Sequence, residues 1–89
     1  MRAIRESSRF RRDLRRMQRR GKDVFTLSAI VATLARGEEL DARHRPHPLI
    51  GTWWPFGYCH IEPDWLLISR VQEAFVELYR PGSHADLFA

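Results

Sequence analysis

The sequence predicts an α+β domain in which an N-terminal pair of helices is followed by a meander of about three or four antiparallel strands. Two observations lead to this fold class. Apolar residues recur with a helical period in the first part of the chain, and from Leu49 onward they follow an extended pattern. The length of 89 residues suits one domain with a modest core, so we expect residues 1–89 to form a single domain.

The first predicted elements are a short strand and a basic helix. Residues 1–6 alternate weakly and are expected to form an edge strand. Ser7 or Ser8 is suited to cap a helix that Gly21 ends. The buried face of this helix is predicted to hold Phe10, Leu14 and Met17, which recur at helical spacing between arginines.

A second helix is predicted to follow almost at once. Asp23 is suited to cap it, and Arg36-Gly37 is a typical end. The apolar stripe comprises Val24, Leu27, Ile30, Val31 and Leu34. Because only Gly21 and Lys22 link the helices, we expect an antiparallel hairpin.

The second half of the chain is predicted to form strands. Residues 38–48 are polar, contain Pro46 and Pro48, and are expected to form a loop. Strands are then expected at residues 58–61, 65–71 and 74–80, with a tight turn at Gln72-Glu73. Pro81-Gly82 is expected to end the last strand, and Ser83 to cap a final turn that holds His84, Leu87 and Phe88.

The charge of the chain is concentrated in its first quarter. Residues 1–22 hold ten basic and two acidic side chains (+8), whereas residues 23–89 hold five basic and nine acidic ones (−4). Fourteen of the fifteen basic residues are arginine, whose planar fork binds phosphate in a bidentate manner. This pattern favours nucleic acid or an acidic protein as the partner, with a solvated helix face as the plain alternative.

Several classes of protein fit the sequence poorly. No apolar run is long enough to cross a bilayer, so we expect no membrane association. The lone cysteine, Cys59, cannot form an internal disulfide, and no secretory apolar segment is present. We therefore expect a cytoplasmic protein.

A set of proton-transferring side chains lies in the second half of the chain: His47, His60, Asp64 and His84. RNA carries its own nucleophile, the ribose 2′-OH, so its cleavage needs a base, an acid and a cation for the developing charge. Histidine suits the first two roles and arginine, at Arg80, the third. Trp65 and Phe88 offer ring faces on which an unpaired base could stack.

Each of these residues also has a plainer interpretation. A loop histidine is usually a surface residue, Trp65 would usually belong to the core, and Arg80 could simply pair with Glu77. The four His and Asp residues could instead hold zinc, although none has the close pair spacing of structural zinc sites. Spacing alone does not decide among these alternatives.

Three motifs carry a resemblance to a known family. They are His47-Pro-Leu-Ile-Gly-Thr-Trp53, His60-Ile-Glu-Pro-Asp-Trp-Leu-Leu-Ile68 and Tyr79-Arg-Pro-Gly-Ser-His-Ala-Asp-Leu-Phe88. Together they resemble the YafQ branch of the RelE toxin superfamily, over nearly the whole chain. The resemblance implies a helical hairpin packed on a small, mostly antiparallel, twisted sheet. It also implies an mRNA interferase that, as the toxin of a type II toxin–antitoxin pair, cuts translated mRNA on the ribosome.

The resemblance also implies roles for residues. The catalytic histidines and aspartate fall on His47, His60, Asp64 and His84, the phosphate-contacting arginine on Arg80, and the motif aromatics on Trp65 and Phe88. We expect His84 to be the general acid and the other three to form the network on the side of the base. No metal or cofactor is expected, and the helix arginines, Arg12 and Arg16 among them, are expected to bind RNA.

Partners and departures follow from the same resemblance. The expected partners are the ribosome with its mRNA and a cognate antitoxin, an acidic protein of the ribbon-helix-helix type. The chain departs from the family pattern where it lacks the usual basic residue near Gly57, where Ser69 replaces a tyrosine, and where Pro81 replaces a threonine. The alternative function is therefore a catalytically weak or inactive module that acts by binding the ribosome or the antitoxin.

Overall fold

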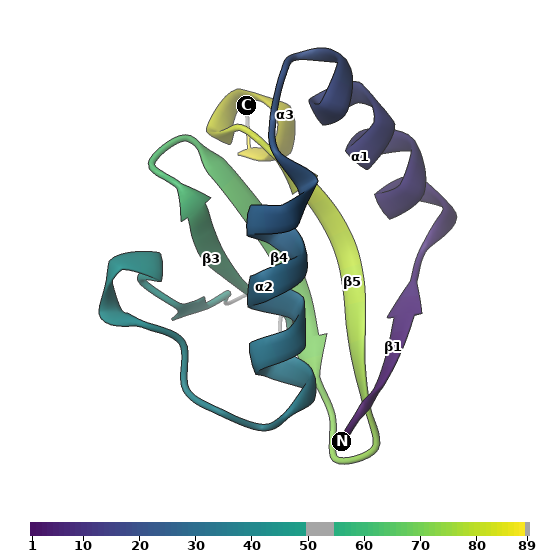
Figure 1. Cartoon of the computed structure of the whole chain (residues 1–89), viewed down its shortest axis with the longest axis vertical. Coiled ribbons are helices and arrows are strands. Elements are labelled where there is room, and N and C mark those ends of the chain that lie inside the picture. Colours follow the sequence, from purple (N-terminus) through teal and green to yellow (C-terminus); the bar gives the residue numbers. More distant parts are fainter. Residues whose placement is uncertain (50–54, 89) are drawn as a thin grey trace.

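The computed structural model describes residues 1–49 and 55–88, in which two long helices and a short C-terminal helix pack on one five-stranded sheet (Figure 1). The elements are, in chain order, β1 (Ala3–Glu6), α1 (Ser8–Arg19), α2 (Val24–Ala35), the 3-10 turn η1 (Ala42–His44), β2 (His47–Pro48), β3 (Gly57–Glu62), β4 (Trp65–Val71), β5 (Phe75–Gly82) and α3 (His84–Phe88). The predicted fold class is confirmed.

The sheet is mixed, with the strand order β1-β5-β4-β3-β2. The last four strands along the chain are antiparallel neighbours, whereas β1 pairs in parallel with β5. Antiparallel pairs need only short turns, and the turn between β4 and β5 is closed by the bond from Gln72 N to Phe75 O, at 2.8 Å. The first strand of the chain, β1, forms one edge of the sheet, and β2 forms the opposite edge.

Both long helices begin at the predicted caps. The hydroxyl of Ser7 accepts from Phe10 N at 2.8 Å, and a carboxylate oxygen of Asp23 accepts from Phe25 N at 2.9 Å. Gly21 has a φ of 85°, a left-handed value that favours glycine, and lets the chain turn back after α1. Helix α1 runs alongside β5, while α2 lies across β4 (Figure 1).

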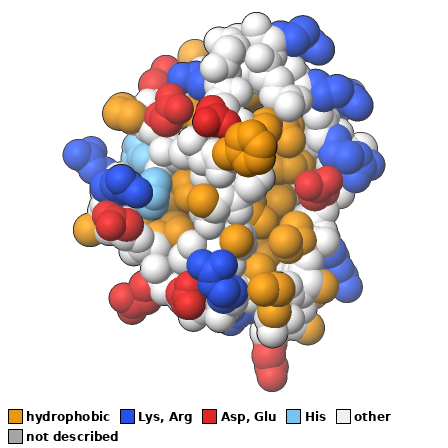
Figure 2. Space-filling model, in the orientation of Figure 1, with side chains coloured by type: hydrophobic (Ala, Val, Ile, Leu, Met, Phe, Trp, Pro, Cys, Tyr) orange, Lys and Arg blue, Asp and Glu red, His pale blue; other side chains and the backbone are white. Residues whose placement is uncertain are grey.

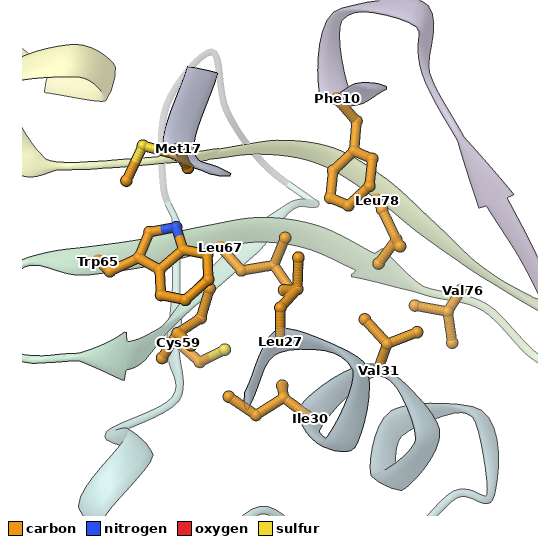
Figure 3. Packing of buried hydrophobic residues seen from close by; sticks show 11 residues of the cluster. Phe10, Met17, Leu27, Ile30, Val31, Cys59, Trp65, Leu67, Val76 and Leu78 are labelled. Carbon is orange, nitrogen blue, oxygen red and sulfur yellow. The ribbon is translucent and has the colours of Figure 1, made fainter. Parts of the chain in front are cut away.

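The main core lies between the two helices and the sheet. Phe10 and Met17 from α1 meet Trp65, Leu67 and the other apolar side chains of the sheet (Figure 3). The buried members of this cluster are Phe10, Met17, Leu27, Ile30, Val31, Cys59, Ile61, Trp65, Leu67, Val76 and Leu78. Their burial is the chief stabilising contribution, since apolar area removed from water is the dominant favourable term in folding.

A smaller cluster covers the opposite face of the sheet. It contains Leu66, Ile68 and Leu87, with Phe56, Tyr58 and Tyr79 packed around them. Strand β4 is therefore buried on both faces, which explains its nearly continuous apolar run. Leu87 belongs to α3, so this second cluster fixes the C-terminal helix against the sheet.

Two boundaries differ from the prediction. The segment 38–48 contains η1 and the two-residue β2, and β5 continues through Pro81 to Gly82. The proline is tolerated there because β1 pairs only as far as Leu78, so this part of β5 has a strand neighbour on one side. Trp53, which ends the first motif, lies outside the described residues, and none of the described helices has the length and apolarity to cross a membrane.

Candidate active site at the open edge of the sheet

The predicted catalytic histidines come together on the face of the sheet that the long helices leave open. Cys59 and Ile61 of β3 point into the helix-side core, so Tyr58 and His60, which alternate with them, lie on the other face. The ring centroids of His60 and His47 are 6.4 Å apart, and those of His60 and His84 are 5.9 Å apart. Residues from β2, β3 and α3 thus form one cluster.

His84 is paired with Asp64. Its Nδ1 lies 3.0 Å from Asp64 Oδ1, and its backbone N–H donates to the same oxygen at 3.1 Å. Because an ionised carboxylate only accepts, Nδ1 carries the proton in this pair and Nε2 is left for a substrate. The two hydrogen bonds from His84 lower the pKa of Asp64. Asp64, which we expected beside the base, therefore belongs with His84.

A small capping network holds His84 in place. Ser83 and Asp86 exchange hydrogen bonds at the start of α3, from Ser83 N to Asp86 Oδ2 at 2.9 Å and from Asp86 N to Ser83 Oγ at 3.1 Å. Arg20 binds Asp86 at 2.7 Å, and this ion pair, followed by the bonds from Ser83, lowers the pKa of Asp86. The end of α1 is thereby tied to the helix that carries His84.

His60 is in a different environment. Burial, reinforced by the nearby positive charges of Arg45, His84 and His47, lowers its pKa from the ordinary value of 6.5. Its Nδ1 is buried and has no hydrogen-bond partner among the described residues. A histidine that resists protonation is suited to accept a proton at neutral pH.

His47 stacks on Tyr58, with ring centroids 5.2 Å apart and an angle of 28° between the planes. This contact depends on Gly57, where a Cβ atom would come within 2.9 Å of the backbone oxygen of His47. A side chain at position 57 would therefore collide with the β2 backbone, so the glycine permits the close approach of His47 to β3.

Of the two predicted stacking residues, only Phe88 is accessible. Its side chain is 42% exposed, and its ring lies against His84 and Tyr58, with centroids 6.3 Å and 5.8 Å away. Trp65 is 0% exposed and sits in the helix-side core. The prediction that Trp65 offers a face for base stacking is wrong for this structure, because packing against Met17 and Cys59 covers the ring (Figure 3).

Arg80 is held by Asp13 of α1. The Arg80 Nε donates to Asp13 Oδ2 at 2.7 Å, while Arg16 reaches Asp13 Oδ1 at 3.3 Å. The alternative pairing of Arg80 with Glu77 is not formed, since Glu77 pairs with Arg70 at 2.6 Å. One buried carboxylate between two guanidinium groups leaves a local excess of positive charge. The predicted RNA-binding Arg16 thereby joins Arg80, whereas Arg12 lies exposed on the same helix.

Replacing Asp13 by alanine is expected to destabilise the fold by about 2 kcal/mol, because it leaves the guanidinium of Arg80 without its carboxylate partner. This loss is somewhat smaller than for a fully buried pair. For a domain of this size the thermal midpoint would fall by roughly 8–16 °C. Differential scanning calorimetry measures this. Glu38→Ala removes the exposed pair with Arg36 and serves as the control, with little change expected. An unchanged midpoint in Asp13→Ala would contradict the structural role.

Three contributors to the site were not predicted. Asp13 was missed because a lone acidic residue on a basic helix gives no sign of burial. Arg45 and His44 were assigned to a plain loop, yet His44 Nδ1 contacts the backbone oxygen of His60 at 2.7 Å. Cys59 lies in the helix-side core, and burial raises the pKa of its thiol to about 12.

Comparison with known proteins shows the family to which the chain belongs. The family model for YafQ, the bacterial toxin of type II toxin–antitoxin systems, matches residues 2–89. The mRNA interferase toxin YafQ of Escherichia coli K12 is 34% identical over 88 residues, which make up 98% of this chain and 96% of that protein.

Solved structures extend the likeness to the whole fold. The toxin in a crystal structure of the Escherichia coli DinJ–YafQ complex superposes with a TM-score of 0.92 at 33% identity, covering 100% of both chains. A copper-bound mutant toxin from Helicobacter pylori gives a TM-score of 0.94 at 35% identity, covering 99% of this chain and 100% of that one. Fold and sequence thus place the protein among the bacterial toxins of type II toxin–antitoxin systems. Within that class, the chain belongs to the YafQ family.

Proposed function

We propose that the protein is a ribosome-dependent endoribonuclease that cuts translated mRNA by metal-independent acid–base catalysis. The observation that carries the proposal is the pairing of two histidines in unlike settings, 5.9 Å apart: His60 is partly buried among cations, and His84 is bound to a carboxylate. Titratable groups with contrasting environments are typical of an acid and a base that act together. A relative named as an mRNA interferase toxin, at 34% identity, supports the mRNA-cleaving part of the proposal.

The proposed reaction uses the RNA's own hydroxyl. His60, with His47 beside it, takes the proton of the 2′-OH, and the 2′-oxygen forms a bond to phosphorus. His84, oriented by Asp64, gives its proton to the 5′-oxygen as the bond from phosphorus to that oxygen breaks. The products are a 2′,3′-cyclic phosphate and a 5′-hydroxyl. Arg80 is proposed, on the family resemblance, to stabilise the charge on the phosphorane.

Binding of RNA is proposed to involve Phe88 and the basic helix. Phe88 lies beside His84 and is exposed enough to stack a base next to the cleaved bond. Basic side chains gather along the side of the molecule that α1 occupies (Figure 2). Arg12 and Arg16 of this helix are proposed to contact ribosomal RNA.

Phe88→Ala is expected to raise the half-saturating concentration of ribosome-bound mRNA roughly 5- to 100-fold, the range that corresponds to losing one base–aromatic stack. Phe88→Tyr should restore most of the affinity. Phe25→Ala provides the matched control, since Phe25 is 79% exposed on α2, a helix that packs on the other face of the sheet. Cleavage assayed over a range of programmed ribosomes measures the effect. Equal values for Phe88→Ala and Phe25→Ala would exclude the stacking role.

The proposed protein partner is a cognate antitoxin of acidic, ribbon-helix-helix type. The Escherichia coli relative has been crystallised in complex with DinJ, and the arginines of α1 complement an acidic segment that folds on binding. Co-expression of this chain with a small acidic protein from the neighbouring reading frame, followed by purification of the pair, tests the assignment.

Metal-assisted cleavage is the competing candidate, because a Helicobacter pylori relative is described as copper-bound and three histidine rings are neighbours in this site. Acid–base catalysis is favoured because no three potential ligands in the described part of the chain are grouped closely enough to hold an ion.

Primer extension on translating mRNA tests whether the protein is an endoribonuclease, with new 5′ ends expected for the wild type. Growth arrest without such ends would support the alternative binding module. Loss of cleavage on removal of copper or zinc, with magnesium kept for the ribosome, would support the metal route.

A further inference from the structure

Arg45 has an unusual backbone conformation for its residue type. It is the single residue other than glycine with a positive φ in the described part of the chain, at φ 42° and ψ 63°. A left-handed conformation costs a residue with a Cβ atom free energy that glycine does not lose. Such positions persist where the surroundings hold them, and they cluster at functional sites.

The turn around Arg45 is anchored directly on the site. Asp41 caps η1 by accepting from Arg43 N at 3.0 Å, and the N–H of Arg45 closes the turn on Ala42 O at 3.1 Å. His44 binds the backbone oxygen of His60 at 2.7 Å. The left-handed residue then directs the chain into β2, where His47 follows two residues later. Along the chain, Arg45 thus lies between His44, which binds the His60 backbone, and His47 of β2.

Beside His60 lies a hollow of about 570 Å³, which we call the flanking subsite. It is lined by Thr26, Arg43, His44, Arg45, His60, Ile61, Glu62 and Pro63. Its volume is within the range of small-molecule sites, roughly 300–1,000 Å³. Histidine surface with basic side chains next to it is visible on this side of the molecule (Figure 2).

The charge of the flanking subsite is positive. Its single acidic lining residue, Glu62, is paired with Lys22 at 3.0 Å. Arg43 makes a long contact of 3.9 Å with Asp41, and Arg45 forms no ion pair within residues 1–49 and 55–88. An unpaired guanidinium in a hollow next to a catalytic histidine is suited to bind an oxyanion.

We propose that the flanking subsite binds the RNA phosphate adjacent to the one that is cleaved, with the Arg45 guanidinium as its main contact. This proposal rests on the endoribonuclease function proposed above and adds a binding residue to it. The RNA chain would pass from the cleaved bond at His60 and His84 into the hollow between β3 and η1. Arg45 thereby supplies, from the loop, a basic group that β3 lacks at Gly57.

The same side chain has a second effect on the base. The charged groups that face His60 are Arg45 from the loop, His47 from β2 and His84 from α3, with Asp64 bound to His84. After burial, Arg45 is the largest of the influences that lower the pKa of His60. Removing the Arg45 side chain should therefore raise the pKa of His60. As the pH falls, His60 should then become protonated, and cleavage should be lost, at a higher pH than in the wild type.

The test compares Arg45→Gly with Arg45→Lys and with the control Arg36→Ala, which removes an exposed arginine at the end of α2. Glycine adopts positive φ freely, so Arg45→Gly removes the guanidinium without straining the turn, and its thermal midpoint should stay equal or rise. Cleavage of ribosome-bound mRNA is measured against substrate concentration and pH. Arg45→Gly should raise the half-saturating concentration about 10- to 100-fold, as expected for a lost charge-assisted hydrogen bond, and Arg45→Lys should raise it less.

Two outcomes would overturn the proposal: an unchanged half-saturating concentration in Arg45→Gly, or an acidic limb of the pH–rate profile that stays at the wild-type pH. Binding of a short RNA that carries a 2′-deoxy nucleotide at the cleaved position provides a readout without catalysis. Chemical-shift changes at His44 and Arg43 on addition of this RNA that disappear in Arg45→Gly would support the subsite even if the wild type cleaved nothing, in which case only the endoribonuclease assignment would fail. Shifts that persist in the variant would place the RNA elsewhere.

Discussion

His84→Ala should slow cleavage of ribosome-bound mRNA by about 100- to 10,000-fold, the usual contribution of a general acid. The fold should survive, because the His84 side chain is 57% exposed and makes its polar contacts with an exposed aspartate. His84→Asn is the matched variant, since its amide can still donate to Asp64 but cannot protonate the leaving oxygen at neutral pH. Both variants are expected to be equally slow in a single-turnover assay.

His60→Ala should cause a loss of the same order, because it removes the partner of His84 in one reaction step. The double variant should then be little slower than either single variant, since groups that act as a unit are strongly non-additive. Full cleavage by His84→Ala together with its loss in His60→Ala would contradict the assignment of the acid. In that case the proton donor would have to be sought elsewhere in the histidine cluster.

Trp65→Ala is expected to destabilise the protein by about 3–5 kcal/mol, as for other large aromatic truncations in a core. Small domains have a total stability of only about 5–15 kcal/mol, so this variant should be partly unfolded near 37 °C. The reason is that Trp65 is fully buried among Met17, Cys59 and neighbouring core residues. Urea denaturation followed by circular dichroism gives the free energy of unfolding.

Trp65→Phe separates packing from RNA binding at this position. It keeps an aromatic ring in the core and should retain most of the stability and an unchanged half-saturating concentration of substrate. The indole Nε1 is buried and has no partner among the described residues, so its loss removes no hydrogen bond. A folded Trp65→Phe that binds mRNA much more weakly would show that the indole contacts RNA after all.

Most of the fold could be predicted because local signals agreed with one another. Ser7 and Asp23 cap the helices as expected, and the residues at helical spacing, Phe10 and Met17, are buried. The parallel pairing of β1 with β5 was beyond prediction, since residues 3–6 and 75–78 meet across nearly the whole chain. The helical hairpin was predicted from its short link, but both helices pack chiefly on the sheet, because the largest apolar surface lies there.

The site was predicted in its residues better than in its pairings. The resemblance selected His47, His60, Asp64 and His84, and the structure brings the three histidines and the aspartate together. Sequence spacing could not show that Asp64 pairs with His84, since twenty residues separate them. The burial of Trp65 and the ion pair between Asp13 and Arg80 likewise depend on how α1 lies on β5.

The chemistry at the cleaved bond provides the most direct test of acid–base cleavage with the 2′-OH as nucleophile. Ribosomes are programmed with an mRNA that carries a single 2′-deoxy nucleotide immediately 5′ of the cleaved bond, and with the matching all-ribose mRNA. The ribose mRNA should be cut to fragments with a 2′,3′-cyclic phosphate and a 5′-hydroxyl, and the 2′-deoxy mRNA should remain intact at that bond. Cleavage of the 2′-deoxy mRNA, or fragments with a 5′-phosphate, would contradict the proposed mechanism.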